Sequence, residues 1–212
     1  MAQKNNEILV YLVRHGMTEL NKSNCFKGPL DPDLNGSGWR DAHALSFYFE
    51  PLELGSIFFS PKKRSRHTAM IINKAKVNVP YHGNSNLHDL DVGDLGGKKK
   101  TPENKQLVQS HAENPDDPFP GGESFNEFRG RVRPMLVDAV RWALRSGKPT
   151  LLVVHSSVIR EAGDLFNRDR HSTKVLPGGV AAVYIEDGEL RAEPIFKPDS
   201  ENIGKPKAEI IT

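Results

Sequence analysis

The sequence predicts an α/β fold, a three-layer αβα sandwich with a mostly parallel central sheet. Short apolar runs rich in β-branched and aromatic residues recur along the chain, and such runs are typical of strands buried on both faces of a parallel sheet. Segments with apolar residues at helical spacing alternate with these runs, which places helices on both faces of the sheet. The 212 residues, 37% of them hydrophobic, suit a single domain over 1–212.

Four apolar runs are the expected strands: 8–13, 57–59, 150–154 and 180–185. The first strand stops at the Arg-His-Gly motif of 14–16, where the glycine permits a sharp exit. After the last strand, the Asp-Gly pair at 187–188 predicts a tight hairpin turn into a further strand over 190–192. Residues 21–36 are rich in Asn, Gly, Pro and Asp and are expected to form a loop.

The expected helices are 38–49, 62–76, 124–147 and 158–166, with a short one over 103–111. Ser60 is the expected N-cap of the second helix, with Pro61 at its first helical position. Ser124 and Glu127 fit a capping box at the start of the third helix. Pro134 lies inside that helix, so it should kink the helix or split it in two.

Two segments are expected to hold little regular structure. Residues 81–122 are rich in Gly, Asp, Asn, Lys and Pro, and a long stretch of this kind in a compact domain is usually functional. We therefore expect 81–122 to be a loop-rich excursion over the active site. Residues 198–212 are expected to form a polar tail.

Composition excludes several classes of function. The 29 Lys and Arg nearly balance the 27 Asp and Glu, and the net charge of +2 argues against nucleic acid or an anionic membrane as partner. The apolar run at 8–13 is too short for a signal-peptide core or a membrane span. A single cysteine, Cys25, excludes an intrachain disulfide, and the scattered histidines lack metal-binding spacing. We therefore expect a cytoplasmic protein without metal or other cofactor, and the sequence does not indicate its oligomeric state.

Polar residues follow three of the predicted strands. Arg14 and His15 follow the first strand, Ser60 leads from the second towards Arg64, and His155 follows the third. Ligands of open α/β sheets bind beyond the carboxyl ends of the strands, so these side chains should meet at one edge. Guanidinium groups match phosphate oxygens bidentately, and a neutral imidazole can act as a nucleophile or a donor. The sequence therefore predicts a site for a phosphate group.

Five short blocks occur in order along the chain: 12–18 (LVRHGMT), 60–69, 87–97, 120–125 (PGGESF) and 154–160. In order and local sequence they resemble the histidine phosphatase superfamily, in its phosphoglycerate-mutase-like branch (branch 1). The resemblance covers the chain from about residue 8 to residue 160 and implies a phosphoglycerate-mutase-like fold. Together the blocks are highly specific.

The resemblance also implies roles for individual residues. His15 would be the nucleophile that accepts the phosphoryl group, for which its ring must be neutral. Arg14, Arg64 and His155 would hold the phosphate oxygens, where preorganised positive charge supplies most of the catalysis. The further phosphate contacts implied by the resemblance are Thr18, Asn21 and the backbone N–H of Ser156.

Some residues depart from the family's pattern. Asp89 occupies the position where the family usually has a Glu that protonates the leaving group. Aspartate is one methylene shorter, and it can serve as the acid if burial and a nearby phosphate raise its pKa. Asp91 or Asp94 are alternatives for this role.

Two groups of lysines occur near the blocks. Lys27 lies near the phosphate by family analogy, although an exposed lysine is the commoner case. The lysines of 98–100 are expected in a solvated loop.

The expected function is therefore that of a metal-independent phosphomonoesterase that acts on a small phosphorylated substrate through a phosphohistidine on His15. A phosphoglycerate mutase that uses the same intermediate is the first alternative, but the stretch from Gly97 to Ser124 is about as short as in the phosphatases. A phosphate-ligand binder that has lost turnover is the second alternative, motivated by the Asp at position 89. Retention of both His15 and His155 argues against it, since a binder has little need of a nucleophile.

Overall fold

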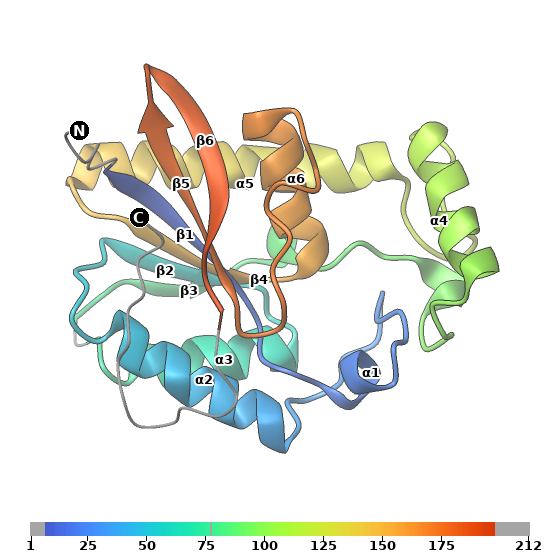
Figure 1. The fold of residues 1–212 in the computed structure, drawn as a ribbon, viewed down its shortest axis with the longest axis horizontal. Coiled ribbons are helices and arrows are strands. Elements are labelled where there is room, and N and C mark those ends of the chain that lie inside the picture. The colour runs from blue at the N-terminus through green and yellow to red at the C-terminus, as the bar shows by residue number, and fades with distance from the viewer. Residues whose placement is uncertain (1–6, 77, 198–212) are drawn as a thin grey trace.

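The computed structural model describes residues 7–76 and 78–197, and its centre is a six-stranded sheet of order β3-β2-β4-β1-β5-β6 (Figure 1). The strands are β1 (Ile8–Arg14), β2 (Ser56–Phe59), β3 (Tyr81–Gly83), β4 (Thr150–Val154), β5 (Val180–Glu186) and β6 (Glu189–Phe196). The first four in sequence pair in parallel, whereas β5 and β6 are antiparallel to their neighbours. The predicted, mostly parallel sheet is confirmed.

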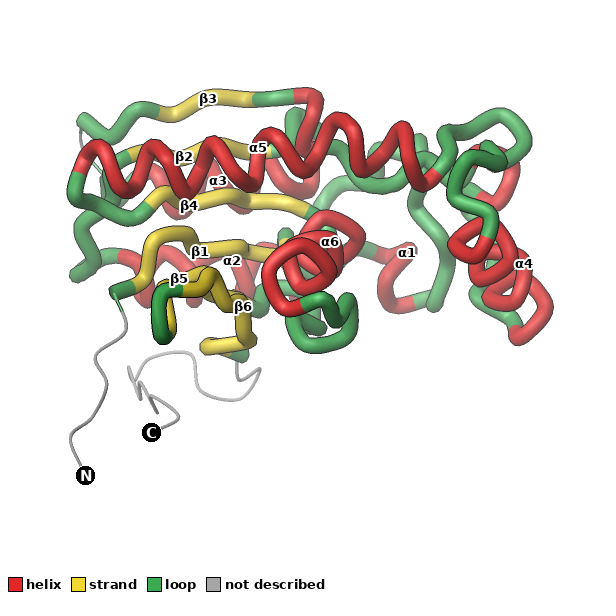
Figure 2. The backbone as a smooth tube through the Cα atoms, turned by 90° about the horizontal axis from the view of Figure 1, so that it is seen from above, coloured by secondary structure: helices red, strands yellow, loops and turns green. Residues whose placement is uncertain are grey.

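Helices cover both faces of this sheet (Figures 1 and 2). The helices are α1 (Glu19–Lys22), α2 (Gly36–Phe49), α3 (Lys63–Asn73), α4 (Pro102–Glu113), α5 (Phe125–Ser146) and α6 (Ser156–Asn167). Helices α5 and α6 cover one face and α2 and α3 the other, whereas α1 and α4 lie to one side of the sheet (Figures 1 and 2). Alternate residues of β1 face opposite ways: Val10 and Leu12 join the core under α5 and α6, whereas Tyr11 and Val13 join the core under α2 and α3. The three-layer prediction is therefore confirmed as well.

The start of α3 differs from the prediction. Ser60 is not the N-cap: α3 is capped by Lys62, whose side chain makes no capping hydrogen bond. The chain continues along the sheet beyond Phe59, because the Ser60 N–H donates to the carbonyl of Val153 at 3.1 Å. This extra residue moves the buried Ser60 hydroxyl away from the helix and to the end of β4, where it meets His155.

Helix α5 begins at the predicted capping box of Ser124 and Glu127 and runs unbroken across Pro134, so of the two predicted effects of this proline, a kink or a split, the split does not occur. Pro134 lies on the exposed side of the helix, while Val132 and Leu136 beside it are fully buried. Burial of the apolar face on both sides of the proline thus keeps the helix continuous despite the lost hydrogen bond.

The excursion of 81–122 holds more regular structure than expected. Its first residues form β3, an edge strand too short for a periodic signal, and α4 extends the predicted helix of 103–111 at both ends. Helix α1 and the early start of α2 also shorten the loop expected over 21–36. The predicted tail of 198–212 lies outside the described residues.

Three strands end at the same edge of the sheet. Arg14 pairs with Val154 in the register of β1 and β4, and the His15 N–H donates to the Val154 carbonyl at 3.0 Å. On the other side of β4, Phe59 pairs with Val153. The residues that follow β1, β2 and β4 are therefore neighbours. No helix in the described ranges is long and apolar enough to span a membrane.

Candidate active site

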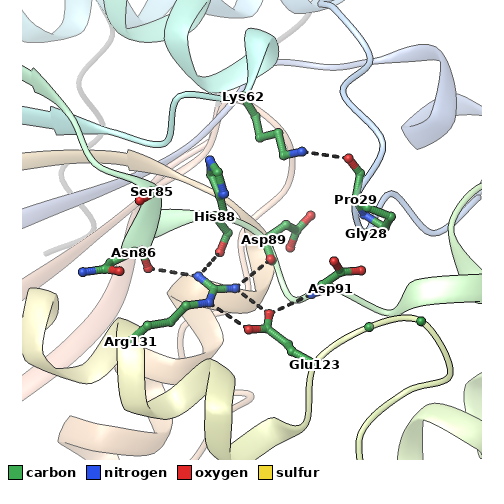
Figure 3. Close-up of a pocket in the computed structure, with 12 residues that line it drawn as sticks. Gly28, Pro29, Lys62, Ser85, Asn86, His88, Asp89, Asp91, Glu123 and Arg131 are labelled. Carbon is green, nitrogen blue, oxygen red and sulfur yellow. Dashed lines mark hydrogen bonds and ion pairs between the residues drawn. The ribbon is translucent and has the colours of Figure 1, made fainter.

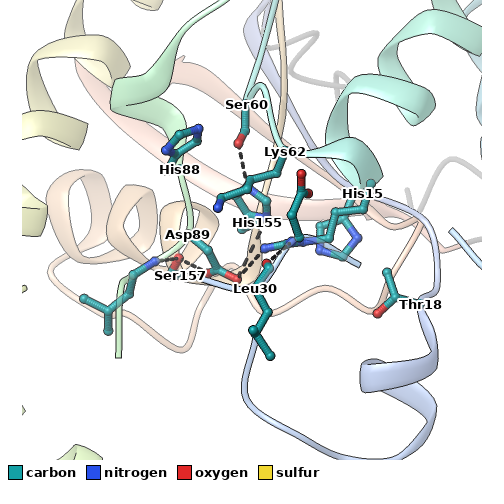
Figure 4. A network of polar contacts seen from close by, with 12 residues as sticks. His15, Thr18, Leu30, Ser60, Lys62, His88, Asp89, His155 and Ser157 are labelled. Carbon is teal, nitrogen blue, oxygen red and sulfur yellow. Dashed lines mark hydrogen bonds and ion pairs between the residues drawn. The ribbon is translucent and has the colours of Figure 1, made fainter. Parts of the chain in front are cut away.

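The two histidines that follow β1 and β4 lie edge to face (Figure 4). The ring centroids of His15 and His155 are 5.2 Å apart, and both side chains are fully buried. Arg64 and Asp89 join them: Arg64 Nη2 lies 3.3 Å from Asp89 Oδ2, which lies 3.9 Å from His155 Nδ1. The structure thus brings together residues that the sequence places on four separate segments.

His15 has the form that a nitrogen nucleophile needs. Its Nδ1 lies 2.7 Å from the carbonyl oxygen of Gly16, and because a carbonyl only accepts, Nδ1 carries the proton. Nε2 therefore bears the lone pair, and this buried atom has no hydrogen-bond partner among the described residues. Burial, together with Arg64 and His155, holds the pKa of His15 well below its usual range, so the ring is neutral at neutral pH.

A second polar contact fixes the segment that bears His15. The Gly16 N–H donates to Oγ1 of Thr68 at 3.1 Å, and that hydroxyl donates to the carbonyl of Arg64 at 2.8 Å. Gly16 also packs directly on the start of α2, where a Cβ at its position would lie 2.4 Å from the Gly38 carbonyl oxygen. The segment of His15 is therefore held between α2 and α3.

His155 is the N-cap of α6, and its Nε2 lies 2.8 Å from Oγ of Ser60. Its buried Nδ1 has no hydrogen-bond partner in the described part of the chain. Burial, followed by the positive charges of Arg64 and Lys27, holds the pKa of His155 well below its usual range. The backbone N–H of Ser156 opens α6 beside it, so the positive end of the helix dipole faces this region.

Both arginines of the cluster are held by main-chain carbonyls. Arg14 Nη1 donates to Val175 at 2.8 Å, and Arg64 Nη1 donates to Leu30 at 3.0 Å. Burial lowers the pKa of Arg14 to about 10 and lowers that of Arg64 as well, so both remain charged at neutral pH. The Nε atom of each is buried without a hydrogen-bond partner among residues 7–76 and 78–197.

Asp89 is held by Ser157, whose hydroxyl donates to Oδ1 at 2.6 Å. Burial raises the pKa of Asp89, but Arg64, Lys27 and the Ser157 hydroxyl outweigh it, so the pKa lies below its usual range. Aspartate at this position reaches the cluster despite its shorter side chain. The protein's own groups hold it ionised, which is the opposite of the protonated form that an acid needs.

Lys27 is buried, with only 5% of its surface accessible, so it is not the exposed lysine that is the commoner case. Burial, partly opposed by Asp89 and reinforced by Arg14, lowers the pKa of Lys27 to about 7. Lys100, the last lysine of the predicted solvated loop, is half-buried and also interacts with Arg14 and Asp89. Lys98 and Lys99 are exposed as expected.

Thr18 and Asn21 lie at the start of α1 and contact each other. The Thr18 hydroxyl donates to Oδ1 of Asn21 at 2.9 Å and accepts from the Asn21 backbone N–H at 3.2 Å, which forms a capping box. The hydroxyl of Thr18 is thus engaged within the loop. The amide nitrogen of Asn21 is the group of this pair that can donate to a phosphate.

Two hollows meet at Asp89. The larger, of about 430 Å³, opens between Lys62, His88 and Arg131 (Figure 3). The smaller, of about 110 Å³, is lined by polar and apolar side chains that include Lys27, Lys100, Arg160 and Arg170. The buried His15 lines neither hollow, and Asp89, which lines both, connects them to the cluster.

The sequence did not indicate a site role for His88, Ser157, Arg131 or Glu123, and it indicated no contact between Ser60 and His155. Ser157 follows the predicted Ser156 directly. A hydroxyl only two residues after His155 is the sequence signal that could have indicated its place in the site. In the described residues, no group of three or more His, Cys, Asp or Glu side chains is arranged to hold a metal ion.

Comparison with known proteins identifies the same family as the sequence motifs. The family model of the histidine phosphatase superfamily (branch 1) matches residues 10–189. A 2,3-bisphosphoglycerate-dependent phosphoglycerate mutase from Cytophaga hutchinsonii is 29% identical over 192 residues, which cover 86% of this chain and 85% of the mutase. The enzyme of that name from Bradyrhizobium diazoefficiens is 32% identical over 165 residues, which cover 73% and 79%.

Solved structures of both phosphatases and mutases share the fold. A mycobacterial glucosyl-3-phosphoglycerate phosphatase has a TM-score of 0.75 at 18% identity and covers 91% of this chain and 100% of its own. A phosphoglycerate mutase from Thermus thermophilus has a TM-score of 0.64 at 26% identity and covers 82% and 91%. At 18% identity the likeness to the phosphatase is one of fold alone.

Proposed function

The chain belongs to the histidine phosphatase superfamily (branch 1), which uses a histidine for phosphoryl transfer, and from this premise we propose that it is a metal-independent phosphomonoesterase. One observation carries the proposal. Four buried polar atoms of the cluster have no hydrogen-bond partner among the described residues: Arg14 Nε, His15 Nε2, Arg64 Nε and His155 Nδ1. Unpaired polar atoms are costly in a protein interior, and a phosphate group supplies acceptors for the donors among them.

In the first step, the lone pair of His15 Nε2 attacks phosphorus while the bond between phosphorus and the leaving oxygen breaks. Arg14 and Arg64 stabilise the charge on the phosphoryl oxygens. The leaving oxygen needs a proton, and Asp89 is ionised before the substrate binds. The phosphate monoanion brings that proton, since the second pKa of a phosphomonoester is about 6. Asp89 takes the proton from the phosphate and passes it to the leaving oxygen.

In the second step, a water molecule attacks the phosphorus of phosphohistidine. Asp89, again a carboxylate, accepts a proton from this water as the bond between phosphorus and Nε2 breaks. His15 leaves as a neutral ring that still carries its Nδ1 proton on the Gly16 carbonyl. The products are inorganic phosphate and the free alcohol, and Asp89 returns to the carboxylate when it releases the proton of the water to the departing phosphate or to solvent.

The proposed substrate is a small phosphorylated molecule rather than nucleic acid or a membrane. The leaving group would occupy the larger hollow, whose 430 Å³ is within the usual size range of small-molecule sites. A protein that only binds phosphate would not need the neutral, oriented imidazole of His15, which argues against a binder without turnover.

Release of nitrophenol from p-nitrophenyl phosphate in the presence of EDTA tests the proposal. We expect turnover by the wild-type chain and none by His15→Ala, with an acid-labile phosphoenzyme seen in the wild type only. Phosphate binding without any turnover would instead favour the binder.

One observation favours mutase-type transfer as the second candidate. The cations of Lys100, Arg160 and Arg170 line the small hollow, where Asp89 is the one carboxylate among the lining residues. Such a hollow suits a substrate with a second anionic group, as the names of the mutase relatives suggest. Conversion of 3-phosphoglycerate to 2-phosphoglycerate faster than release of phosphate would replace the first candidate with the second.

A further inference from the structure

Arg131 of α5 reaches the backbone of the segment that bears Asp89 (Figure 3). Its Nη1 donates to the carbonyls of Asn86 and His88, each at 3.0 Å, and its Nη2 donates to the carbonyl of Asp89 itself at 3.0 Å. One guanidinium thus binds three carbonyls of the chain that leads to the proposed acid. Arginine suits this task because its donors lie in one rigid plane.

Glu123 completes the arrangement from the opposite side. Its carboxylate accepts from Arg131 Nε at 2.8 Å and from Nη2 at 2.5 Å, which makes the ion pair bidentate. Its Oε1 also accepts the backbone N–H of Asp91 at 2.9 Å. The residues on either side of Leu90 are therefore fastened to the same pair of side chains. Both charged groups are at most about one-fifth exposed.

This segment has no regular secondary structure of its own, and its other anchors include Ser157, whose Oγ accepts the Leu90 N–H at 3.1 Å, and the burial of Leu90 and Val92. Residues 88–92 lie between two single-turn 3₁₀ helices, Ser85–Leu87 and Gly93–Leu95, and belong to no strand or longer helix. Asp89 has one methylene fewer than the glutamate usual in the family, so its carboxylate follows the backbone more closely. Any displacement of the segment would move the carboxylate away from the leaving oxygen.

We propose that Arg131 and Glu123 are positioning residues that hold the Asp89 carboxylate against the leaving group. The inference rests on the proposed function, because it assigns Asp89 the transfer of the leaving-group proton. Displacement of a reacting group by about 1 Å can cost about 10²-fold in rate. This loss would fall on esters whose leaving oxygen needs a proton and would spare esters with an acidic leaving group.

The test compares two esters in four variants. Arg131→Ala removes the hydrogen bonds to the three carbonyls, and Arg131→Lys keeps the charge but has no planar guanidinium to bind them all. Glu123→Gln removes the negative charge that pairs with Arg131. Arg133→Ala is the matched control, since Arg133 lies on the same helix but pairs with Glu161 and Asp164 at 2.6 and 2.7 Å. Turnover is measured with p-nitrophenyl phosphate and with an alkyl phosphate, alongside inhibition by inorganic phosphate and the thermal midpoint.

For Arg131→Ala we expect about a 10²-fold loss of kcat/KM on the alkyl ester and less than about a threefold loss on the nitrophenyl ester, because kcat/KM reports the first step and not the later hydrolysis of phosphohistidine. Inhibition by inorganic phosphate should stay within about twofold, because the phosphate contacts lie elsewhere. Arg131→Lys, which keeps the charge and folds more readily, should show the same pattern more weakly. Arg133→Ala should match the wild type on both esters.

In the background of Asp89→Asn, Arg131→Ala should cause no further loss on the alkyl ester, because the group that it positions is gone. Equal losses on both esters, or losses that multiply with Asp89→Asn, would overturn the inference while leaving the proposed function intact. A wild-type chain without turnover on either ester would overturn both.

Discussion

The hydroxyl of Ser157 donates a 2.6 Å hydrogen bond to Oδ1 of Asp89, so the first turn of α6 influences the protonation of a carboxylate on a distant segment. Ser157→Ala removes a hydrogen bond to the charged form, and such bonds are worth about 1.5–3 kcal/mol. The pKa of Asp89 should therefore be higher in this variant than in the wild type.

In Ser157→Ala, the acid limb of the plot of kcat/KM against pH should therefore shift to higher pH. This limb reports the free enzyme's Asp89, which must be ionised to accept the proton of the substrate. Ser157→Thr keeps the hydroxyl and should leave the limb in place. An unchanged limb in both variants would show that Ser157 does not set the pKa.

A second prediction concerns the alkaline limb of the same profile. Because the pKa of Asp89 is lowered, the proposed mechanism takes the leaving-group proton from the substrate, whose own pKa is about 6. The kcat/KM for an alkyl phosphate should therefore fall about tenfold per unit above about pH 6, in proportion to the monoanion. A flat profile to pH 8 would mean that Asp89 carries the proton itself.

Replacement of the carboxylate gives a third prediction. Asp89→Asn should lower kcat/KM for esters with poor leaving groups, because their first step needs the proton, and should lower kcat/KM for p-nitrophenyl phosphate much less. General acid catalysis is typically worth about 10²–10⁴-fold, which sets the expected loss on an alkyl ester. The kcat/KM values of the two esters test this prediction, and an equal loss of kcat/KM on both would remove Asp89 from the acid role.

Lys27 gives a prediction for stability. Its pKa is about 7 in the folded chain against 10.5 ordinarily, so the unfolded chain binds more protons between these values. Stability should consequently rise with pH from about 7 towards 10.5. In Lys27→Met this contribution disappears, so the thermal midpoint of the variant should rise less between pH 7 and 9 than that of the wild type. Parallel curves would place the lysine in solvent.

The same variant should bind phosphate less tightly. At pH 6 the ammonium of Lys27 is charged and adjoins the cluster, and one charge-assisted hydrogen bond is worth about 1.5–3 kcal/mol. The inhibition constant for inorganic phosphate should therefore rise about tenfold or more in Lys27→Met. This difference should shrink at pH 8, where the wild-type lysine is largely neutral. A pH-independent difference would contradict the assigned pKa.

The fold was predictable wherever local signals agreed with long-range packing. The continuous apolar runs of β1 and β4 identify central strands, and a polar residue at the end of such a strand lies at the ligand-binding edge whatever the loops do. For this reason His15 and His155 could be located before any coordinates. Pro134 shows the limit of a local rule, because burial of the surrounding helix face outweighs it.

The rest of the site depends on contacts that sequence spacing does not encode. Ser60 carries a helix-capping signal, yet its hydroxyl contacts an imidazole on another strand. Burial of Lys27 follows from the packing of a loop that has no periodicity. Arg131 lies in a predicted helix and Glu123 just before it. Only the tertiary structure shows that both form hydrogen bonds with the segment of Asp89.

The most direct test of the account is to identify the phosphorylated atom. Brief incubation with a labelled phosphomonoester, followed by alkaline quenching and mass spectrometry, should place the phosphoryl group on Nε2 of His15. His15→Ala should carry no label, and Asp89→Asn should accumulate it, because hydrolysis of the intermediate loses its base. A label on His155, or turnover that survives in His15→Ala, would contradict the central claim.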